Sequence, residues 1–173
     1  RRVVSGDYSG NVIVWDAATL KQLVSKSSGA SRVNSVSFSS DGSRVVSGAY
    51  SGNVVEWGAA TRTPLLSKRT GASRVNSVSF SSDGSRVVSG DYSGNVIVWE
   101  AATLTQLVSK RSGASRVNSV SFSSDGSRVV SGDYSGNVIV WEAATLKQLV
   151  SKSTGANTVN SVSFSSDGSR VVS

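Results

Sequence analysis

Residues 85–126 read SRVVSGDYSGNVIVWEAATLTQLVSKRSGASRVNSVSFSSDG, and this unit of 42 residues decides the fold. Near-identical copies occupy residues 1–42, 43–84, 85–126 and 127–168, and residues 169–173 begin a fifth copy. A repeat period of 20–50 residues is typical of solenoids, propellers and similar arrays. We therefore interpret residues 1–173 as a single repeat array.

Each unit contains four short apolar runs separated by turn residues. In the third unit the runs are Arg86–Ser89, Asn95–Trp99, Gln106–Lys110 and Val117–Phe122. Such runs, rich in β-branched or aromatic residues and bounded by Gly, Ser, Asp or Asn, predict strands rather than helices. Ser124-Asp125-Gly126 and Tyr92-Ser93-Gly94-Asn95 predict tight turns. A four-stranded antiparallel sheet with two faces to cover is stabilised by radial stacking, so the prediction is an all-β fold, a β-propeller with four blades per chain.

Over its whole length the chain resembles the WD-repeat family of β-propellers. The family's strand ending in Trp and an acid returns as Trp15-Asp16, Trp99-Glu100 and Trp141-Glu142, while Trp57-Gly58 departs from it. The resemblance implies a structural role for the four tryptophans: Trp15, Trp57, Trp99 and Trp141.

Two positions depart from the family in every repeat. The usual Gly-His is Gly-Ala at Gly29-Ala30, Gly71-Ala72, Gly113-Ala114 and Gly155-Ala156, and the usual turn Asp is Ser9, Ser51, Ser93 or Ser135. In the family this His and Asp share a buried hydrogen-bond network with Ser and Trp. Losing both ends of such a network can be nearly neutral, so we expect the fold to survive, with each indole N–H bonded to another group or to water.

The resemblance also predicts an assembly. The chain opens with RRVVSG, the second strand in family order, so the first blade lacks its innermost strand and the C-terminal VNSVSF is surplus. We expect a homodimer, in which two copies of four blades exchange this strand head to tail and complete an eight-bladed ring. The alternative is that the chain is one piece of a longer protein, and its start without Met predicts a fragment or a processed form.

Composition excludes several kinds of chemistry. The chain has no Cys, His or Met, which rules out disulfides, thiolate zinc sites, Cys nucleophiles, His bases and Ser-His triads. We expect no enzymatic activity, no metal and no cofactor. Glu56 stands where other repeats have Val14, Val98 and Val140, and alternation along the strand places it on a buried face. Glu56 is either the result of drift in a tolerant strand or a functional residue.

No apolar run is long enough to span a membrane and no signal peptide is visible, so we expect an intracellular, cytoplasmic protein without a membrane partner.

Two loops per blade are expected to form one rim of the propeller and to bind a protein or peptide of acidic or mixed charge, because Tyr and Arg are enriched at binding hot spots. The rim residues are Asp7, Tyr8, Arg32, Tyr50, Arg74, Asp91, Tyr92, Arg116, Asp133 and Tyr134. Alternatively, Tyr packs on the neighbouring blade and the charges only keep the protein soluble.

Charge and composition bear on two other kinds of partner, nucleic acid and glycans. Lys and Arg number 18 against 11 Asp and Glu, a net charge of +7, but they are spread evenly, so we do not expect nucleic acid to bind. A glycan-binding propeller, with aromatic pockets between blades, is the main alternative; a designed or amplified array without a ligand is another. The second repeat differs most from the others, at Ala49, Val55, Glu56, Gly58, Arg62 and Pro64. These differences favour naturally duplicated copies over a designed array.

Overall fold

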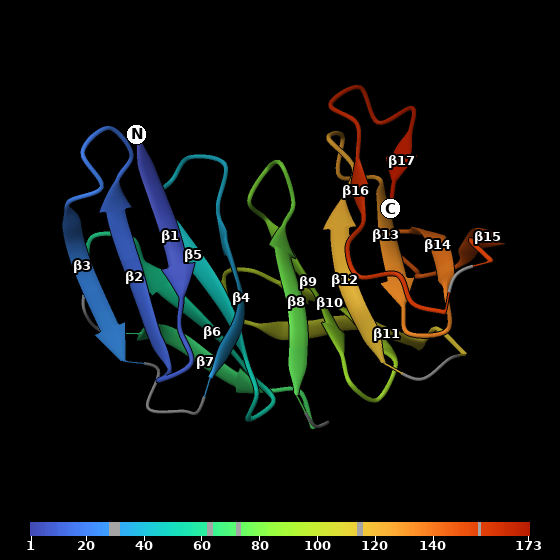
Figure 1. The fold of residues 1–173 in the computed structure, drawn as a ribbon, viewed down its shortest axis with the longest axis horizontal. Helices are drawn as coiled ribbons and strands as arrows, with labels where there is room; N and C mark the ends of the chain where they lie inside the picture. The colour runs from blue at the N-terminus through green and yellow to red at the C-terminus, as the bar shows by residue number, and fades with distance from the viewer. Residues whose placement is uncertain (28–31, 62–63, 72–73, 114–115, 156) are drawn as a thin grey trace.

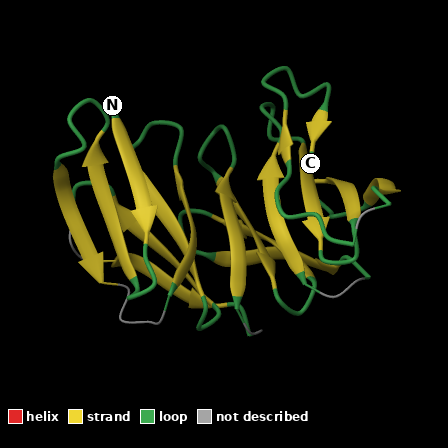
Figure 2. Cartoon of the chain, in the orientation of Figure 1, coloured by secondary structure: helices red, strands yellow, loops and turns green. Residues whose placement is uncertain are grey.

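The computed structural model describes residues 1–27, 32–61, 64–71, 74–113, 116–155 and 157–173, and these residues form strands and turns without a helix (Figure 2). The first sheet has three strands, β1 (Arg2–Gly6), β2 (Asn11–Asp16) and β3 (Gln22–Ser27). The second has four, β4 (Val33–Phe38), β5 (Arg44–Ala49), β6 (Asn53–Gly58) and β7 (Pro64–Arg69). The third sheet is β8 (Val75–Phe80), β9 (Arg86–Asp91), β10 (Asn95–Glu100) and β11 (Thr105–Arg111). The fourth is β12 (Val117–Phe122), β13 (Arg128–Asp133), β14 (Asn137–Glu142) and β15 (Gln148–Ser153), and β16 (Ser163–Phe164) pairs with β17 (Val171–Val172).

Within each sheet the strands follow chain order and pair antiparallel, which confirms the predicted four-stranded antiparallel blades. The runs expected in the third repeat begin and end within two residues of β9 to β12. The three-stranded first sheet and the extra strand β16 also appear as predicted.

The four sheets lie side by side in chain order and fan out as an open arc, with the first sheet and the β16–β17 hairpin at opposite ends (Figure 1). The strands that lead their sheets, β4, β8 and β12, are neighbours along one side of the arc. Side chains join them, because Ser35 and Ser77 accept hydrogen bonds from the backbone N–H of Val78 (3.0 Å) and Val120 (3.1 Å) in the next sheet. The serines of these strands therefore bridge sheets whose backbones are not paired with each other.

The hydrophobic core is distributed between the sheets. One cluster joins Val46 and Val54 of the second sheet to Phe80 and Trp99 of the third, and the same kind of cluster occurs at the neighbouring interfaces. Trp57, Trp99 and Trp141 are buried and Trp15 is half-buried. Neighbouring sheets therefore bury apolar side chains between them, as blades of a propeller do.

Every indole N–H in these sheets donates to a serine of the neighbouring strand. The Nε1···Oγ distances are 2.8 Å for Trp15 to Ser5 and 2.9 Å for Trp57 to Ser47, Trp99 to Ser89 and Trp141 to Ser131. The expected alternative partner of the indole is thus a serine hydroxyl. Of the Gly-Ala pairs, Gly71, Gly113 and Gly155 have positive φ, while Gly29, Ala30, Ala72, Ala114 and Ala156, like Arg62, lie outside the described residues.

Candidate functional site

One rim of the arc is formed by hairpin turns, which join the second and third strands of the four-stranded sheets and β1 to β2 in the first sheet. In the third sheet the Asp91 carboxylate accepts hydrogen bonds from Ser93 N (2.9 Å), Asn95 N (2.9 Å) and Asn95 Nδ2 (2.8 Å). Asp133 holds its turn in the same way, and both carboxylates are only 1% exposed. Asp7 accepts from Asn11, and these hydrogen bonds lower the pKa of the Asp7 carboxyl. The three aspartates that the sequence suggested as binding residues are therefore occupied within their own turns.

The tyrosines of the same turns point to solvent. Tyr8 is 79% exposed, and Tyr50, Tyr92 and Tyr134 are between 44% and 47% exposed. The backbone N–H of the last three donates to the carbonyl oxygen of the arginine that precedes the first strand of the same sheet, at 2.9 to 3.0 Å. This pairing fixes one Tyr and one Arg side by side on each of these sheets.

The arginine and tyrosine side chains alternate across sheet boundaries. The guanidinium carbon of Arg74 lies 4.3 Å from the ring centre of Tyr50 and 4.8 Å from that of Tyr92. Arg116 continues the series, at 5.3 Å from Tyr92 and 3.9 Å from Tyr134. We call these five side chains the Tyr–Arg ladder; Arg32, 5.6 Å from the Tyr8 ring, forms a separate pair. These distances are those of cation–π contacts.

The rim of the tyrosine turns, which we call the Tyr rim, is strongly basic. The outer strands end there, because Arg111 pairs with Asn95 and Lys110 with Val96 beside the hairpin turn. The basic residues of the Tyr rim are Arg32, Lys68, Arg69, Arg74, Lys110, Arg111, Arg116 and Lys152, and its acidic ones are Asp7, Asp91 and Asp133. Lys26 is not among them, because its amino group bonds to Gly58, which pairs with Arg44 at the other end of β6. The other charged residues of the described chain, nine basic and eight acidic, nearly balance. Most of the net positive charge therefore lies on one rim, although the sequence shows only an even spread of Lys and Arg.

The opposite rim is built from Ser-Asp-Gly turns and is structural. Asp83 accepts hydrogen bonds from Ser81 Oγ (2.5 Å), Ser85 N (3.0 Å) and Ser85 Oγ (2.7 Å), and these donors, with Ser81 first, lower the pKa of the Asp83 carboxyl to about 2. Asp41, Asp125 and Asp167 hold equivalent turns and have pKa values lowered by the same serine contacts.

An arginine of the preceding sheet fastens three of these four turns. Arg44 Nη2 donates to the carbonyl oxygen of Gly84 (2.6 Å), Arg86 to Gly126 (2.8 Å) and Arg128 to Gly168 (3.0 Å). In each case the guanidinium also lies 5.4 to 5.6 Å from the ring centre of the phenylalanine in the next sheet, namely Phe80, Phe122 and Phe164. The sequence places these arginines after Asp-Gly turns but gives no sign of this contact, because the acceptor lies 40 residues further on.

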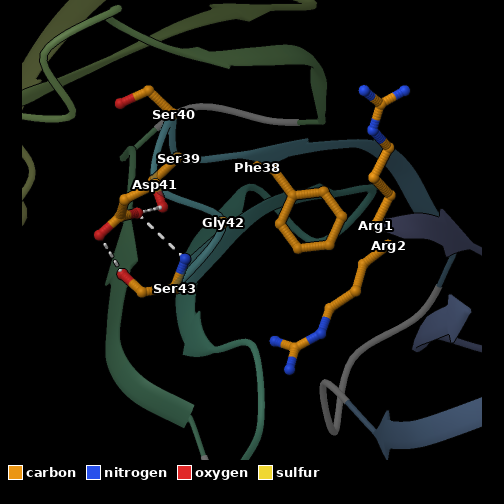
Figure 3. Close-up of a pocket in the computed structure, with 8 residues that line it drawn as sticks. All are labelled: Arg1, Arg2, Phe38, Ser39, Ser40, Asp41, Gly42 and Ser43. Atoms are coloured by element: carbon orange, nitrogen blue, oxygen red, sulfur yellow. Dashed lines mark hydrogen bonds between the residues drawn. The ribbon is translucent and has the colours of Figure 1, made fainter.

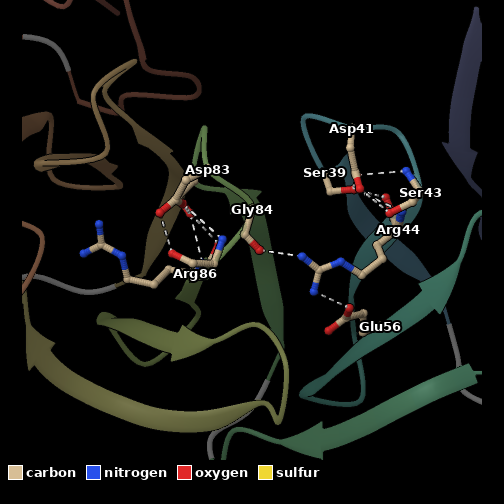
Figure 4. A network of polar contacts seen from close by, with 10 residues as sticks. Ser39, Asp41, Ser43, Arg44, Glu56, Asp83, Gly84 and Arg86 are labelled. Carbon is tan, nitrogen blue, oxygen red and sulfur yellow. Dashed lines mark hydrogen bonds and ion pairs between the residues drawn. The ribbon is translucent and has the colours of Figure 1, made fainter.

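Glu56 is buried, as alternation predicts. It is 2% exposed, and its Oε1 accepts a hydrogen bond from Arg44 Nη1 at 3.0 Å, as Figure 4 shows beside the Gly84 contact. Burial raises the pKa of the Glu56 carboxyl, and the Arg44 charge partly offsets the rise. The second carboxylate oxygen has no hydrogen-bond partner among the described residues. A buried pair with one partner in this position fits a tolerated substitution better than an acid–base site.

Lys26, which the sequence places in a loop of the rim, is buried. Its amino group donates to the carbonyl oxygen of Gly58 in the next sheet and lies 5.7 Å from the Trp57 ring centre. Burial lowers the pKa of Lys26 to about 8. Lys68, Lys110 and Lys152 occupy the same place in their repeats but are exposed.

A cavity of about 680 Å³ lies at the boundary between the first and second sheets. Figure 3 shows Phe38 between the Asp41 turn and the side chains of Arg1 and Arg2. Arg2 corresponds to Arg44, yet no hydrogen bond joins it to Gly42 in the described residues, and Arg2 is exposed. The cavity therefore lies where the arginine-to-glycine hydrogen bond seen at three other sheet boundaries is not formed.

Among the described residues, no group of acidic side chains is arranged to hold a metal ion, and no helix is long and apolar enough to cross a membrane.

The antiparallel sheets stacked side by side, with a serine-bonded Trp in each of the first four, define a repeat protein of the β-propeller class. The family described as WD domain, G-beta repeat matches residues 21–57, 63–100 and 105–142, well over half of the chain. The chain therefore belongs to the WD-repeat family, whose members generally act as scaffolds for protein interactions. A comparison with curated protein sequences gave no match.

Proposed function

We propose that this protein is a non-catalytic interaction scaffold whose Tyr rim binds an acidic segment of a partner protein or peptide. The observation that carries the proposal is the Tyr–Arg ladder, which crosses three sheets on the rim where most of the net positive charge lies. The acidic residues of this rim are turned into their own hairpins, so they do not compete for the arginines.

The ladder is suited to a carboxylate-rich partner for two physical reasons. Stacking between Tyr92 and Tyr134 holds the Arg116 guanidinium in one plane, so that less conformational entropy is lost when it binds. A planar guanidinium donates paired hydrogen bonds to a carboxylate, and exposed tyrosine hydroxyls supply further donors along the same line. Binding should therefore weaken as salt is added.

The test uses a fluorescein-labelled peptide of glutamate residues and measures its anisotropy at low and at physiological salt. The double variant Arg116→Gln/Lys110→Gln removes two charges from the Tyr rim, and the control Lys21→Gln/Lys147→Gln removes two exposed charges from the opposite rim. We expect the Tyr-rim variant to bind several-fold more weakly than the control, since an exposed ion pair contributes about 0.2–1 kcal/mol. Equal affinities for the two variants would overturn the proposal. Tighter binding of a uridine oligonucleotide than of the peptide would also overturn it and favour nucleic acid.

The glycan-binding alternative loses its main support. Trp57, Trp99 and Trp141 are buried with their indole N–H groups bonded to serine, so they are not available to stack on a sugar ring. The exposed aromatic residues are the tyrosines, and on the second to fourth sheets their faces are already occupied by arginine.

We also propose that residues 1–173 act as one array and that two copies form a homodimer that closes an eight-bladed ring. In support, β1 is the unpaired edge of a three-stranded sheet, and the segment that ends in β16 repeats the leading strand of the complete sheets. By the register of β12 on β13, the partner's Val162 would lie opposite Ser5 and the partner's Phe164 opposite Val3. Within one chain β17 holds this place on β16, since Phe164 pairs with Val171, which repeats Val3. Closure therefore requires that β17 gives way to β1 of the second copy.

Light scattering on the eluting protein tests this assembly. We expect a species of twice 17.9 kDa, and removal of residues 169–173 should increase its share because β16 is then free. A 17.9 kDa species for both forms at every concentration would contradict the ring.

A further inference from the structure

The hairpin turn of the second sheet differs from the other three in one residue. Ala49 stands where the other sheets have Asp7, Asp91 and Asp133. The backbone of the turn is unchanged: Gly52 N donates to Ala49 O at 3.0 Å, and φ of Gly52 is 83°, against 86° for Gly94 in the third sheet. The second sheet therefore keeps the turn but lacks the carboxylate that fills it elsewhere.

Two buried side-chain atoms at and next to this turn lack a hydrogen-bond partner among the described residues. In the third sheet the carboxylate accepts from two backbone N–H groups and one amide side chain, and Ala49 offers no acceptor to the equivalent groups of Ser51 and Asn53. Ser51 Oγ and Arg74 Nε are both buried and have no hydrogen-bond partner within the described ranges. Buried donors of this kind cost free energy unless they find an acceptor.

We propose that this turn is a binding site for a carboxylate group, which takes the position that the Asp91 and Asp133 side chains occupy in the neighbouring sheets. The backbone and side-chain donors of this turn are those that hold a carboxylate in the third sheet, and the Arg74 guanidinium, 4.3 Å from the ring centre of Tyr50, adds a positive charge to the same turn. Ala49 lacks the carboxylate group that Asp91 and Asp133 carry, and formate is a free carboxylate of the same size. The slot lies beneath Tyr50 and Ser51, both of which are in contact with solvent.

The carboxylate can come from a small free acid or from an acidic side chain of a partner bound to the Tyr rim. The first source needs only the slot itself. The second rests on the proposed function and would make the slot an anchor at one end of the Tyr–Arg ladder. The two sources are separated by using formate and the glutamate peptide as independent probes.

The repeats supply matched variants for the test. Ala49→Asp fills the slot with the residue that the other sheets carry, so it is expected to fold and to lose the site. Asp91→Ala vacates the corresponding slot of the third sheet and is expected to create a second site.

The first experiment measures the thermal unfolding midpoint in sodium formate against sodium chloride of equal ionic strength. For three non-hydrogen atoms the affinity ceiling corresponds to a Kd of about 1 mM or weaker, so formate is titrated well above that concentration. We expect formate to raise the midpoint of the unmodified protein more than chloride does, to have no such effect on Ala49→Asp, and to act more strongly on Asp91→Ala. The same formate response in Ala49→Asp as in the unmodified protein, or no formate response at all, would overturn the proposal.

The second experiment measures binding of the labelled glutamate peptide to the unmodified protein and to Ala49→Asp. Weaker binding to Ala49→Asp, together with competition by formate, assigns the slot to a side chain of the partner. Equal binding of the peptide to both proteins, with a formate response in the unmodified protein, assigns the slot to a small free acid. The Tyr-rim proposal is tested independently on the Arg116→Gln/Lys110→Gln variant, which leaves the slot intact, so the two proposals can fail separately.

Discussion

Gly90 sets the distance between the third and fourth sheets, and its replacement by alanine is a direct test of how the blades pack. A Cβ atom at this position would lie 2.5 Å from Val117 Cγ1 and 3.0 Å from Val120 Cγ1. Carbon atoms in van der Waals contact are about 3.5–4.0 Å apart, so β9 and β12 would have to separate by about 1 Å. Overpacking of a filled core costs about 1–3 kcal/mol, and we expect Gly90→Ala to lower the free energy of unfolding by that amount.

The control removes the atom that the new methyl group meets. Val117→Ala deletes Cγ1, and on its own it also destabilises because Val117 is fully buried. In the double variant the lost side chain makes room for the new one, so its destabilisation should be at least about 1 kcal/mol smaller than the sum of the single effects. Urea unfolding followed by tryptophan fluorescence measures all three variants. A Gly90→Ala protein as stable as the unmodified one, or strict additivity in the double variant, would refute this account of blade spacing.

Three further variants test buried polar groups by urea unfolding. Ser89→Ala leaves the buried Trp99 indole N–H without its acceptor and should cost about 1–3 kcal/mol, whereas full stability would show that the bond is dispensable. Glu56→Val restores the residue found in other sheets, where Arg86 keeps its glycine contact without an acid, so stability at pH 7 should be unchanged or higher. Because burial raises the pKa of Glu56 above 4.5, its contribution to stability falls as pH rises through that region, and this fall should vanish in the variant. Burial lowers the pKa of Lys26 from 10.5 to about 8, so between pH 8 and pH 10.5 the unfolded chain binds more protons than the folded one, and the free energy of unfolding should rise with pH. Lys26→Met should abolish this rise. The same pH dependence of stability in the variant and the unmodified protein would contradict the burial of the amine.

The strands and turns could be predicted from the sequence because each repeat supplies its own signals. Apolar runs such as Asn95–Trp99 and glycines such as Gly94, whose φ is 86°, act within a few residues. Burial of Glu56 followed from alternation along one strand and is found in the structure. Four copies of the same local pattern leave little room for another secondary structure.

What the sequence could not show depends on contacts between repeats. Lys26 and Lys68 have the same place in the repeat, but only Lys26 is buried, with its amino group on the carbonyl oxygen of Gly58 one sheet away. Asp91 was predicted to face a partner, yet it is occupied by Asn95 within its own turn. The Tyr–Arg ladder is equally hidden, because Arg74 lies between tyrosines of two different sheets.

Hydrogen–deuterium exchange with and without the glutamate peptide tests the central claim, that the Tyr rim is the binding surface, most directly. We predict that the peptide slows exchange in the tyrosine turns, residues 49–53, 91–95 and 133–137, and leaves the Ser-Asp-Gly turns at 81–86 and 123–128 unchanged. Protection confined to the Ser-Asp-Gly turns, or no protection while the peptide is bound, would contradict the assignment of the Tyr rim as the interaction surface.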